Sequence, residues 1–271
     1  MYLGRTASEM TINVNTIAID SEYLKRDVKI TLLMPEELIS AEPFNLLVLN
    51  DGQEIENVRL AESLGILFET GMIKPVIVAA VHSGNDRLHE YGVAGHPDFK
   101  FRGSKAANYS KFITLELLPA IKKEIGIDDF GTSAFAGFSL GGLSAMDIAW
   151  HHPKLFNKTG VFSGSFWWRS KELGKGYTEA DRIMHHVIRE SKHKPELKFW
   201  LQTGTKDETA DRNKNGIIDS IDDTVDIIKE LEARGYTRPA DIQYLELVGG
   251  THSTATWAYA LPKFLVWAFG R

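Results

Sequence analysis

Short apolar runs alternate along this chain with segments whose apolar residues recur at helical spacing, and this alternation restricts the possible folds more than any other feature. Seven runs rich in Val, Ile, Leu and Phe have the character of buried strands. They cover residues 28–33, 46–49, 76–81, 134–136, 160–162, 199–202 and 242–247. Six helical patterns accompany them, at residues 58–68, 109–125, 140–150, 181–189, 224–233 and 257–269.

Strands that alternate with helices are joined by right-handed crossovers. The pattern therefore predicts an α/β fold with a mostly parallel central sheet and helices on both faces. The first strands are joined without a helix, which predicts an antiparallel start. Residues 1–271 fit one such domain, because no internal repeat or low-complexity linker divides them. Ligands of open α/β sheets bind beyond the carboxyl ends of the strands, so functional residues are expected in the loops there.

Composition excludes several classes of function. The 31 Lys and Arg against 36 Asp and Glu give a net charge of −5, which provides no broad basic surface for nucleic acid. The chain has no cysteine, so a covalent nucleophile must be another residue type. It has neither a membrane-spanning stretch nor a secretory signal. We therefore expect a cytoplasmic protein without membrane or nucleic-acid partners; its oligomeric state is not indicated.

The segment Gly137-Phe138-Ser139-Leu140-Gly141 is a G-x-S-x-G motif between a predicted strand and a predicted helix. This spacing is typical of a tight, strained turn, in which side chains at the glycine positions would clash with neighbouring backbone. The turn exposes the serine hydroxyl and directs the first N–H groups of the helix toward it. Ser139 is therefore the candidate nucleophile, and the Leu140 N–H is a candidate oxyanion donor. The alternative is a packing turn with a buried serine.

Chain order selects the partners of the serine. In the α/β-hydrolase arrangement the catalytic triad follows the order serine, acid, histidine. Of the nine histidines, His252 alone follows every predicted strand, so it is the candidate base. Asp207 comes shortly after the strand at 199–202 and is the candidate acid, which would hold the tautomer of His252. Glu208 is an adjacent rival for that role.

Loops after other predicted strands supply an oxyanion donor and pocket walls. The N–H of Gln53 follows an early strand and is the second candidate oxyanion donor, although the preceding Asp-Gly is also an ordinary turn sequence. Arg87, Tyr91, Trp167 and Trp168 are candidate pocket walls, while an aromatic pair more often packs in a core. No long insertion is left for a lid, so we expect an open cleft.

Residues 211–222, DRNKNGIIDSID, match a calcium-binding loop. The candidate ligands are Asp211, Asn213, Asn215, the Ile217 carbonyl, Asp219 and Asp222. Gly216 permits the sharp turn of such a loop, and Asp222 replaces the usual bidentate Glu. The alternative is a solvated turn that caps the following helix. Calcium here would be structural, because the ligands lie after Asp207 and outside the ester chemistry; no cofactor is expected for catalysis.

Together these residues resemble the putative esterase family of α/β hydrolases, which includes enterochelin-esterase-like proteins, S-formylglutathione hydrolases, feruloyl esterases and mycolyltransferases. The resemblance covers most of the chain. It rests on LNDGQ at 49–53, YSKFITLELLP at 109–119, GFSLGGLS at 137–144, HPKLF at 152–156, SGSFWW at 163–168, GTKDE at 204–208, GTH at 250–252 and Trp257. It implies a serine carboxylic-ester hydrolase with the α/β-hydrolase fold and the triad Ser139, Asp207 and His252. The insertion at 211–222 departs from the simplest members.

The enterochelin-esterase-like branch looks nearest, through Asp51-Gly52-Gln53 and SGSFWW. The resemblance leaves the ester itself open, since family members act on siderophore esters, thioesters and plant phenolic esters. We expect a small-molecule or polymer-linked ester as the substrate. Two alternatives are an acyltransferase that uses the same acyl-enzyme and a catalytically inactive, calcium-dependent binding protein.

Overall fold

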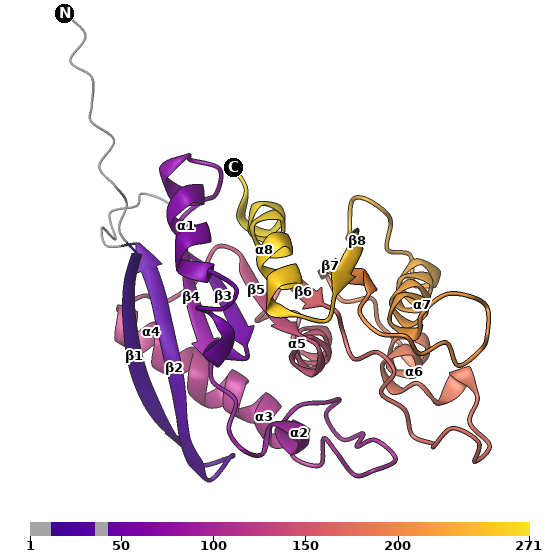
Figure 1. Cartoon of the computed structure of the whole chain (residues 1–271). Helices are drawn as coiled ribbons and strands as arrows, with labels where there is room; N and C mark the ends of the chain where they lie inside the picture. Colours follow the sequence, from indigo (N-terminus) through magenta and orange to yellow (C-terminus); the bar gives the residue numbers. More distant parts are fainter. Residues whose placement is uncertain (1–11, 36–42) are drawn as a thin grey trace, which may run out of the picture.

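An eight-stranded sheet runs through residues 12–35 and 43–271, which are the residues that the computed structural model describes (Figure 1). Its strands are β1 (Ile12–Ser21), β2 (Arg26–Pro35), β3 (Asn45–Asn50), β4 (Val76–Val81), β5 (Ser133–Phe138), β6 (Lys158–Phe162), β7 (Lys198–Lys206) and β8 (Ile242–Thr251). They are arranged in the order β1-β2-β4-β3-β5-β6-β7-β8. The pairs β1–β2 and β2–β4 are antiparallel and the other pairs are parallel, so the predicted sheet is confirmed. The first residues, to which the prediction of no export signal applies, lie outside the described ranges.

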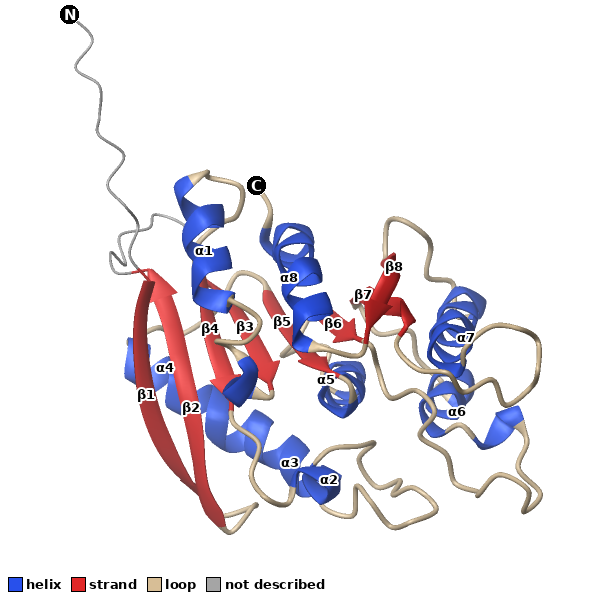
Figure 2. Ribbon diagram, viewed as in Figure 1, coloured by secondary structure: helices blue, strands red, loops and turns tan. Residues whose placement is uncertain are grey.

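Helices cover both faces of the sheet (Figure 2). One face is packed against α1 (Leu60–Glu69) and α8 (Thr254–Phe269). The other is packed against α3 (Ala106–Lys111), the π-helical η2 (Phe112–Leu117), α4 (Leu118–Ile125), α5 (Leu140–His151), α6 (Ile183–Glu190) and α7 (Asp219–Ala233). Short helices η1 (Gly52–Glu54), α2 (Arg87–Glu90) and η3 (Glu179–Asp181) lie in the connections.

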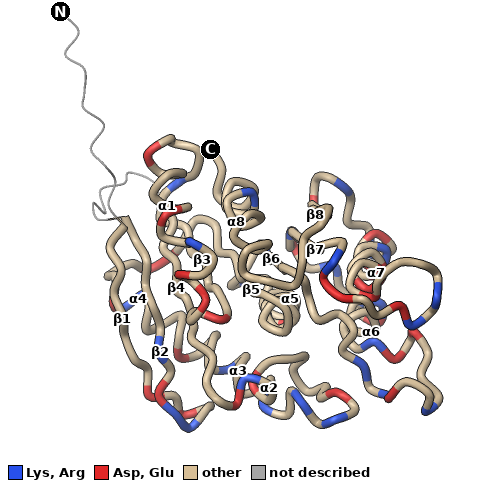
Figure 3. The backbone as a smooth tube through the Cα atoms, in the orientation of Figure 1, with Lys and Arg blue, Asp and Glu red and all other residues tan. Residues whose placement is uncertain are grey.

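The central strands are apolar because both of their faces are covered. Every residue of β3 and β4 is buried, as is usual for parallel strands between two helical layers. Along β3, Leu46 and Val48 belong to the core beneath α5, whereas Leu47 and Leu49 belong to the core beneath α1 and α8. Charged residues lie around the periphery, and β3, β4 and β5 carry none (Figure 3).

Some elements differ from the sequence patterns. The patterns do not predict β1 or the four-residue α2. Strand β1 lies at the edge of the sheet, where most of its side chains are exposed and apolar and polar residues are mixed. Helix α7 begins at Asp219, five residues before the predicted start at residue 224. The apolar spacing does not indicate this first turn because the turn is polar. No helix among the described residues has the length and apolar character needed to cross a bilayer.

Substitution of Gly160 tests the packing of α8 on β6. A methyl group there would lie 2.4 Å from Cε2 of the buried Phe264. We expect Gly160→Ala to lower the free energy of unfolding by about 1–3 kcal/mol, measured by denaturant unfolding. Gly65→Ala in α1, where nothing lies within 4 Å of the added carbon, is the control and should be neutral or stabilising. Equal midpoints for Gly160→Ala and the unsubstituted protein would contradict this packing.

Candidate active site

Ser139 occupies a sharp turn between β5 and α5. Its backbone angles, φ 55° and ψ −121°, are rare for a residue with a side chain. The turn has no space for larger residues in the motif: a Cβ at Gly137 would lie 2.4 Å from the Gly141 carbonyl oxygen, and one at Gly141 would lie 2.6 Å from Oδ2 of Asp51. The N–H of Ser139 donates to the carbonyl of Phe162, at 2.8 Å. The strand–serine–helix turn expected from the motif is therefore present.

Strand register brings the candidate acid and base to the same edge of the sheet. Lys206 of β7 is paired with Thr251 of β8, so Asp207 and His252 follow two neighbouring strand ends. Close approach of the two segments depends on glycine, because a Cβ at Gly204 would lie 2.3 Å from the Gly250 carbonyl oxygen. The acid and the base are thus placed side by side by backbone pairing.

An aromatic residue lies between the candidate base and the candidate nucleophile. Trp257, in the first turns of α8, stacks on Phe138 with ring centroids 4.9 Å apart. The edge contact of Trp257 with His252 has a centroid distance of 5.3 Å. Because Phe138 directly precedes Ser139, Trp257 lies between the histidine loop and the serine turn.

The three candidate triad residues are not hydrogen-bonded to one another in this structure. Among the described residues, His252 forms no hydrogen bond with Ser139 or Asp207. Instead, Oγ of Ser139 lies 3.3 Å from Oγ of Ser165, and Oδ2 of Asp207 accepts from the N–H of Gly204 at 3.0 Å. Hydrogen bonds between catalytic groups are often long before substrate binds and tighten in the complex.

Burial and neighbouring charges shift the pKa values of both partners. Burial raises the pKa of Asp207, against the opposing effects of the Gly204 N–H, the Ser163 hydroxyl and the positive charge of His252. Desolvation lowers the pKa of His252; the charge of Asp207 raises it and that of Arg87 lowers it. His252 therefore loses its proton more readily than an ordinary histidine, which suits a general base.

Glu208 has different neighbours from Asp207. Burial raises the pKa of Glu208, and the charge of Asp219 raises it further, whereas the Ser220 N–H lowers it. Both Asp219 and Ser220 belong to the start of α7. The charges that act on His252 come from Asp207 and Arg87. Glu208 is thus associated with α7 and Asp207 with the histidine.

The two candidate oxyanion donors lie on neighbouring loops. Leu140 is the first residue of α5, and Gln53 lies in η1, so neither N–H has a carbonyl acceptor within its own helix. Asn50, at the end of β3, donates its side-chain amide to the Gly141 carbonyl at 2.7 Å. This bond holds the end of β3 against the serine turn and brings the loop with Gln53 toward it.

An ion pair fixes that loop. Arg87 binds the buried Asp51 through two hydrogen bonds, each of 2.7 Å, and its guanidinium lies 5.0 Å from the ring centroid of Tyr91. Asp51 has a left-handed backbone, with φ 60°, and its N–H donates to the Tyr91 hydroxyl at 3.2 Å. The pair orders the turn directly before Gln53 and places a positive charge near His252.

Two of the four expected pocket walls are core residues instead. Tyr91 and Trp168 are completely buried, so the expectation that they line a pocket is wrong. Trp168 fills the space beside Gly92 and Gly103, and its Nε1 donates to the His96 carbonyl at 3.2 Å. Their polar groups bond to backbone, which explains why aromatic side chains next to crevice loops are buried here.

Trp167 and Arg87 keep part of their surface in solvent. Trp167 carries the guanidinium of Arg102 at 4.9 Å from its ring centroid. These two side chains are the remaining candidates for contact with substrate.

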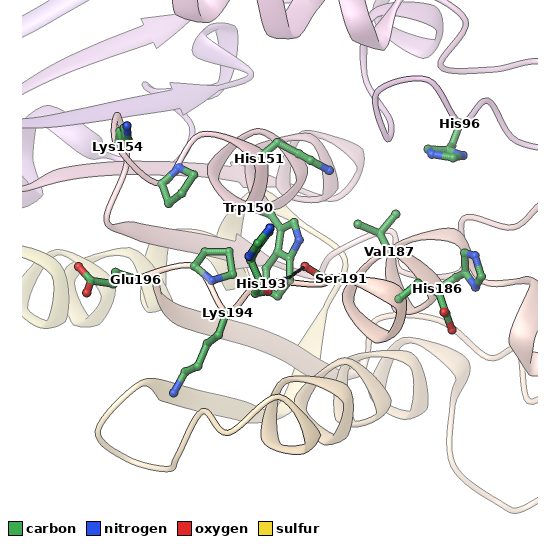
Figure 4. Close-up of a pocket in the computed structure, with 13 residues that line it drawn as sticks. His96, Trp150, His151, Lys154, His186, Val187, Ser191, His193, Lys194 and Glu196 are labelled. Atoms are coloured by element: carbon green, nitrogen blue, oxygen red, sulfur yellow. Dashed lines mark hydrogen bonds between the residues drawn. The ribbon is translucent and has the colours of Figure 1, made fainter.

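A second serine–histidine contact lies elsewhere. Oγ of Ser110 is 3.2 Å from Nε2 of His152, but Ser110 lies inside α3 with ordinary helical backbone. No helix N-terminus therefore follows it to stabilise an oxyanion. A cavity of about 760 Å³ near the ends of α5 and α6 is lined by Trp150, His151 and His186 and by Ser191, whose hydroxyl donates to the His193 carbonyl (Figure 4). Neither place combines a strained serine with a base and an acid.

The loop at 211–222 is held together by hydrogen bonds between its own residues. Asp211 accepts from the N–H groups of Asn215, at 3.1 Å, and Gly216, at 2.9 Å. The side-chain amides of Asn213 and Asn215 both donate to Oδ2 of Asp222, at 3.0 and 2.7 Å.

The other predicted ligands of this loop are less favourably placed. Oδ1 of Asp219 accepts from the Arg212 N–H at 2.9 Å, and Ile217 is exposed. Within the described ranges no three histidine, aspartate or glutamate side chains are grouped to hold a metal ion. The amide nitrogens of Asn213 and Asn215 face Asp222, and their amide oxygens accept from the N–H groups of Asn215 and Ile217. Carboxylate and amide oxygens, the ligand types that suit calcium, are thus present in the loop but are engaged in hydrogen bonds within it.

A serine turn at the centre of a mostly parallel sheet, with an acid and a histidine after its last two strands, defines the α/β-hydrolase class. The chain matches the family model described as putative esterase over residues 21–268 and therefore belongs to the putative esterase family. This assignment places it in a family of carboxylic ester hydrolases. No curated protein has a significantly similar sequence.

Solved structures share the fold. The chain is similar to the enterobactin esterase FES from Shigella flexneri, with a TM-score of 0.72 and 21% identity over 94% of this chain and 58% of that one. The chain is also similar to a ferulic acid esterase, with a TM-score of 0.69 and 16% identity over 96% of this chain and 98% of that one. For the IroE-like serine hydrolase from Shewanella oneidensis, the TM-score is 0.67 and the identity is 19%, over 94% of this chain and 80% of that one. The chain thus spans little more than half of the enterobactin esterase, and at these identities the likeness is one of fold.

Two residues with contacts at this edge of the sheet are not predicted as site residues by the sequence. Ser163 and Ser165 lie in the SGSFWW segment, which contributes to the family resemblance. Both are buried, and one contacts the candidate nucleophile. Their position after the strand next to β5 was the available signal, because polar residues at such strand ends face the crevice.

The charge of Arg87 should contribute to the pH dependence of the candidate base, beside desolvation and the charge of Asp207. With the pKa of His252 lowered, the acid limb of kcat/KM should have its midpoint below the ordinary histidine value of about 6.5. Arg87→Gln removes a positive charge and leaves Asp51 unpaired, and both changes favour the imidazolium, so the midpoint should move to higher pH. Arg59→Gln, in an exposed ion pair with Glu62, is the matched control. An unchanged midpoint in Arg87→Gln would contradict the assignment.

Proposed function

We propose that this protein hydrolyses carboxylic esters through an acyl-enzyme on Ser139, with His252 as general base and Asp207 as the acid that orients it. One observation carries the proposal. The strained serine turn opens onto the sheet edge where the paired ends of β7 and β8 deliver Asp207 and His252 together. This meeting of three strand ends supports the proposed roles of the three residues in acyl transfer.

The reaction follows from these positions. His252 removes the hydroxyl proton of Ser139 as Oγ attacks the ester carbonyl carbon, and the charge that develops on the carbonyl oxygen is stabilised by the N–H groups of Leu140 and Gln53. The imidazolium then gives its proton to the departing alcohol as the ester C–O bond breaks. Water, activated by His252, attacks the acyl-enzyme and releases the acid, which restores Ser139.

The substrate is proposed at the level of chemical class. We infer a small-molecule or polymer-linked ester, since Trp167 offers a flat apolar surface and Arg87 a positive charge beside the base. The similar structures include an enterobactin esterase and a ferulic acid esterase, and ferulic acid is aromatic, which makes aromatic esters the first substrates to assay. Acyl transfer is the second candidate reaction, and product analysis with added alcohols separates it from hydrolysis.

Removal of the nucleophile should abolish ester cleavage. We expect Ser139→Ala to reduce kcat on p-nitrophenyl esters on the order of 10³-fold or more without unfolding, because its hydroxyl is the attacking atom. Ser110→Ala removes the other histidine-bonded serine and should retain activity. The assignment is wrong if folded Ser139→Ala keeps half of the activity, or if Ser110→Ala loses it.

The acid can be distinguished from its neighbour by isosteric amides. Asp207→Asn should lower kcat by roughly 10²–10⁴-fold while leaving KM similar, because the tautomer of His252 is no longer held. Glu208→Gln should have a small effect on kcat, because Glu208 is associated with α7. The reverse pattern of kcat values would make Glu208 the acid.

We also propose that the loop at 211–222 holds a structural calcium ion. Asp211, Asn213, Asn215 and Asp222 would supply side-chain oxygens and Ile217 its carbonyl, with Asp219 released from Arg212. The ion would order the chain between the acid and α7 and would take no part in the ester chemistry.

Thermal unfolding tests this ion. Calcium at a hundredfold excess over Kd should stabilise the protein by roughly 3 kcal/mol, seen as a higher Tm. Asp211→Ala should remove this response, whereas Lys214→Gly, which suits the positive φ of 59° and removes no ligand, should keep it. Calorimetry of metal-stripped protein that detects no binding at millimolar calcium would refute the proposal.

A further inference from the structure

Ser163 is a buried serine in an unfavourable backbone conformation beside the candidate acid. It follows β6 directly, is 2% exposed and has φ 47°, in the left-handed region that favours glycine. Its N–H donates to the Gln202 carbonyl of β7 at 2.8 Å. Glycine would fit this backbone with less strain, so the contacts of the serine side chain are of interest.

The hydroxyl of Ser163 can donate one hydrogen bond, and the hydrogen bond that it accepts restricts the direction of that donation. Nε1 of Trp257 donates to Oγ of Ser163 at 3.0 Å. A hydroxyl that accepts one hydrogen bond still has its own donor available. Trp257 is itself fixed by stacking on Phe138, so the acceptor side of the hydroxyl is occupied by a rigid group.

The carboxylate of Asp207 is the acceptor on the other side. Its Oδ1 is buried and accepts no hydrogen bond of standard geometry from any described residue, while Oδ2 is occupied by the Gly204 N–H. The Ser163 hydroxyl lies close enough to lower the pKa of Asp207. A buried carboxylate without a hydrogen-bond donor is destabilised in its charged form, so a hydrogen bond from a neighbouring hydroxyl would be favourable.

We propose that Ser163 is a positioning residue for the acid: its hydroxyl, oriented by Trp257, donates to Asp207 and keeps the carboxylate ionised and directed at His252. The proposal rests on the proposed triad of Ser139, His252 and Asp207. It also gives Trp257 a role beyond packing, because the same indole contacts the ring of the base and orders the hydroxyl that serves the acid.

The pH profile of kcat/KM separates this role from a structural one. The titratable groups that face Asp207 are His252, Glu208 and Tyr244. Arg87 is the other charged group that faces His252. Loss of a donor to the carboxylate makes the acid–base pair hold its proton more tightly. The apparent pKa of the acid limb should therefore rise by about one unit, and kcat should fall about tenfold.

The experiment compares Ser163→Gly and Ser163→Ala with the unsubstituted protein on a p-nitrophenyl ester from low to neutral pH, together with Tm. Ser163→Gly removes the hydroxyl and relieves the backbone, so its fold should persist. Trp257→Phe keeps the stacking ring and removes only the N–H, and it should shift the acid limb in the same direction. Ser144→Ala is the control, a buried serine whose hydroxyl serves the Gly92 backbone and whose loss should leave the apparent pKa unchanged.

Each outcome is decisive when Ser139→Ala is assayed in parallel. An upward shift in a Ser163 variant and in Trp257→Phe, absent from Ser144→Ala, supports the proposal. A folded Ser163→Gly with an unchanged acid limb overturns it, and so does lower kcat that only follows lower Tm. If neither Ser163 variant folds, an unchanged limb in Trp257→Phe overturns it. Activity retained by Ser139→Ala would instead overturn the proposed function itself.

Discussion

The backbone strain at Ser139 is the constraint on which the rest of the site depends. A residue held in a sparsely populated region costs about 1–3 kcal/mol, and it persists only where its surroundings leave no alternative. Here β5 lies between β3 and β6 in the middle of the sheet, and the glycines of the turn are in contact with backbone and with Asp51. The Asn50 side chain and the Phe162 carbonyl bind the turn from both sides. The buried core thus stabilises one half-buried serine in one backbone conformation.

The nucleophile and the base are held to different extents. The serine turn follows β5, whose residues are buried from Ala134 onward, whereas β8 is an edge strand with several exposed residues, and His252 at its end keeps part of its surface in solvent. Local stability usually follows burial, so the histidine loop is expected to move more easily than the serine turn. Trp257 connects the two, because one indole contacts Phe138, His252 and Ser163. A fixed nucleophile with a more adaptable base agrees with a triad that closes on substrate.

Apolar runs and helical spacing predicted the sheet well, because β3 and β4 are buried throughout and the middle parts of β5, β6 and β7 are buried and mostly apolar. The exposed β1 lacked that signal. At the site, the G-x-S-x-G spacing predicted a turn that steric limits enforce locally. Tyr91 and Trp168 could not be placed by sequence, because their burial depends on Gly92 and Gly103 leaving space for an indole. The contact between Ser163 and Trp257 joins residues far apart in the chain, and only the folded sheet brings them together.

The central claim is that Ser139 forms the acyl-enzyme, and covalent labelling tests it most directly. The folded protein is treated with an aryl fluorophosphonate, which reacts with activated serines, and the modified peptide is identified by mass spectrometry. The account predicts one adduct per chain, on the peptide that contains Ser139, and no adduct after Ser139→Ala. An adduct on Ser110 or another serine, or undiminished ester hydrolysis in fully labelled Ser139 protein, would contradict it.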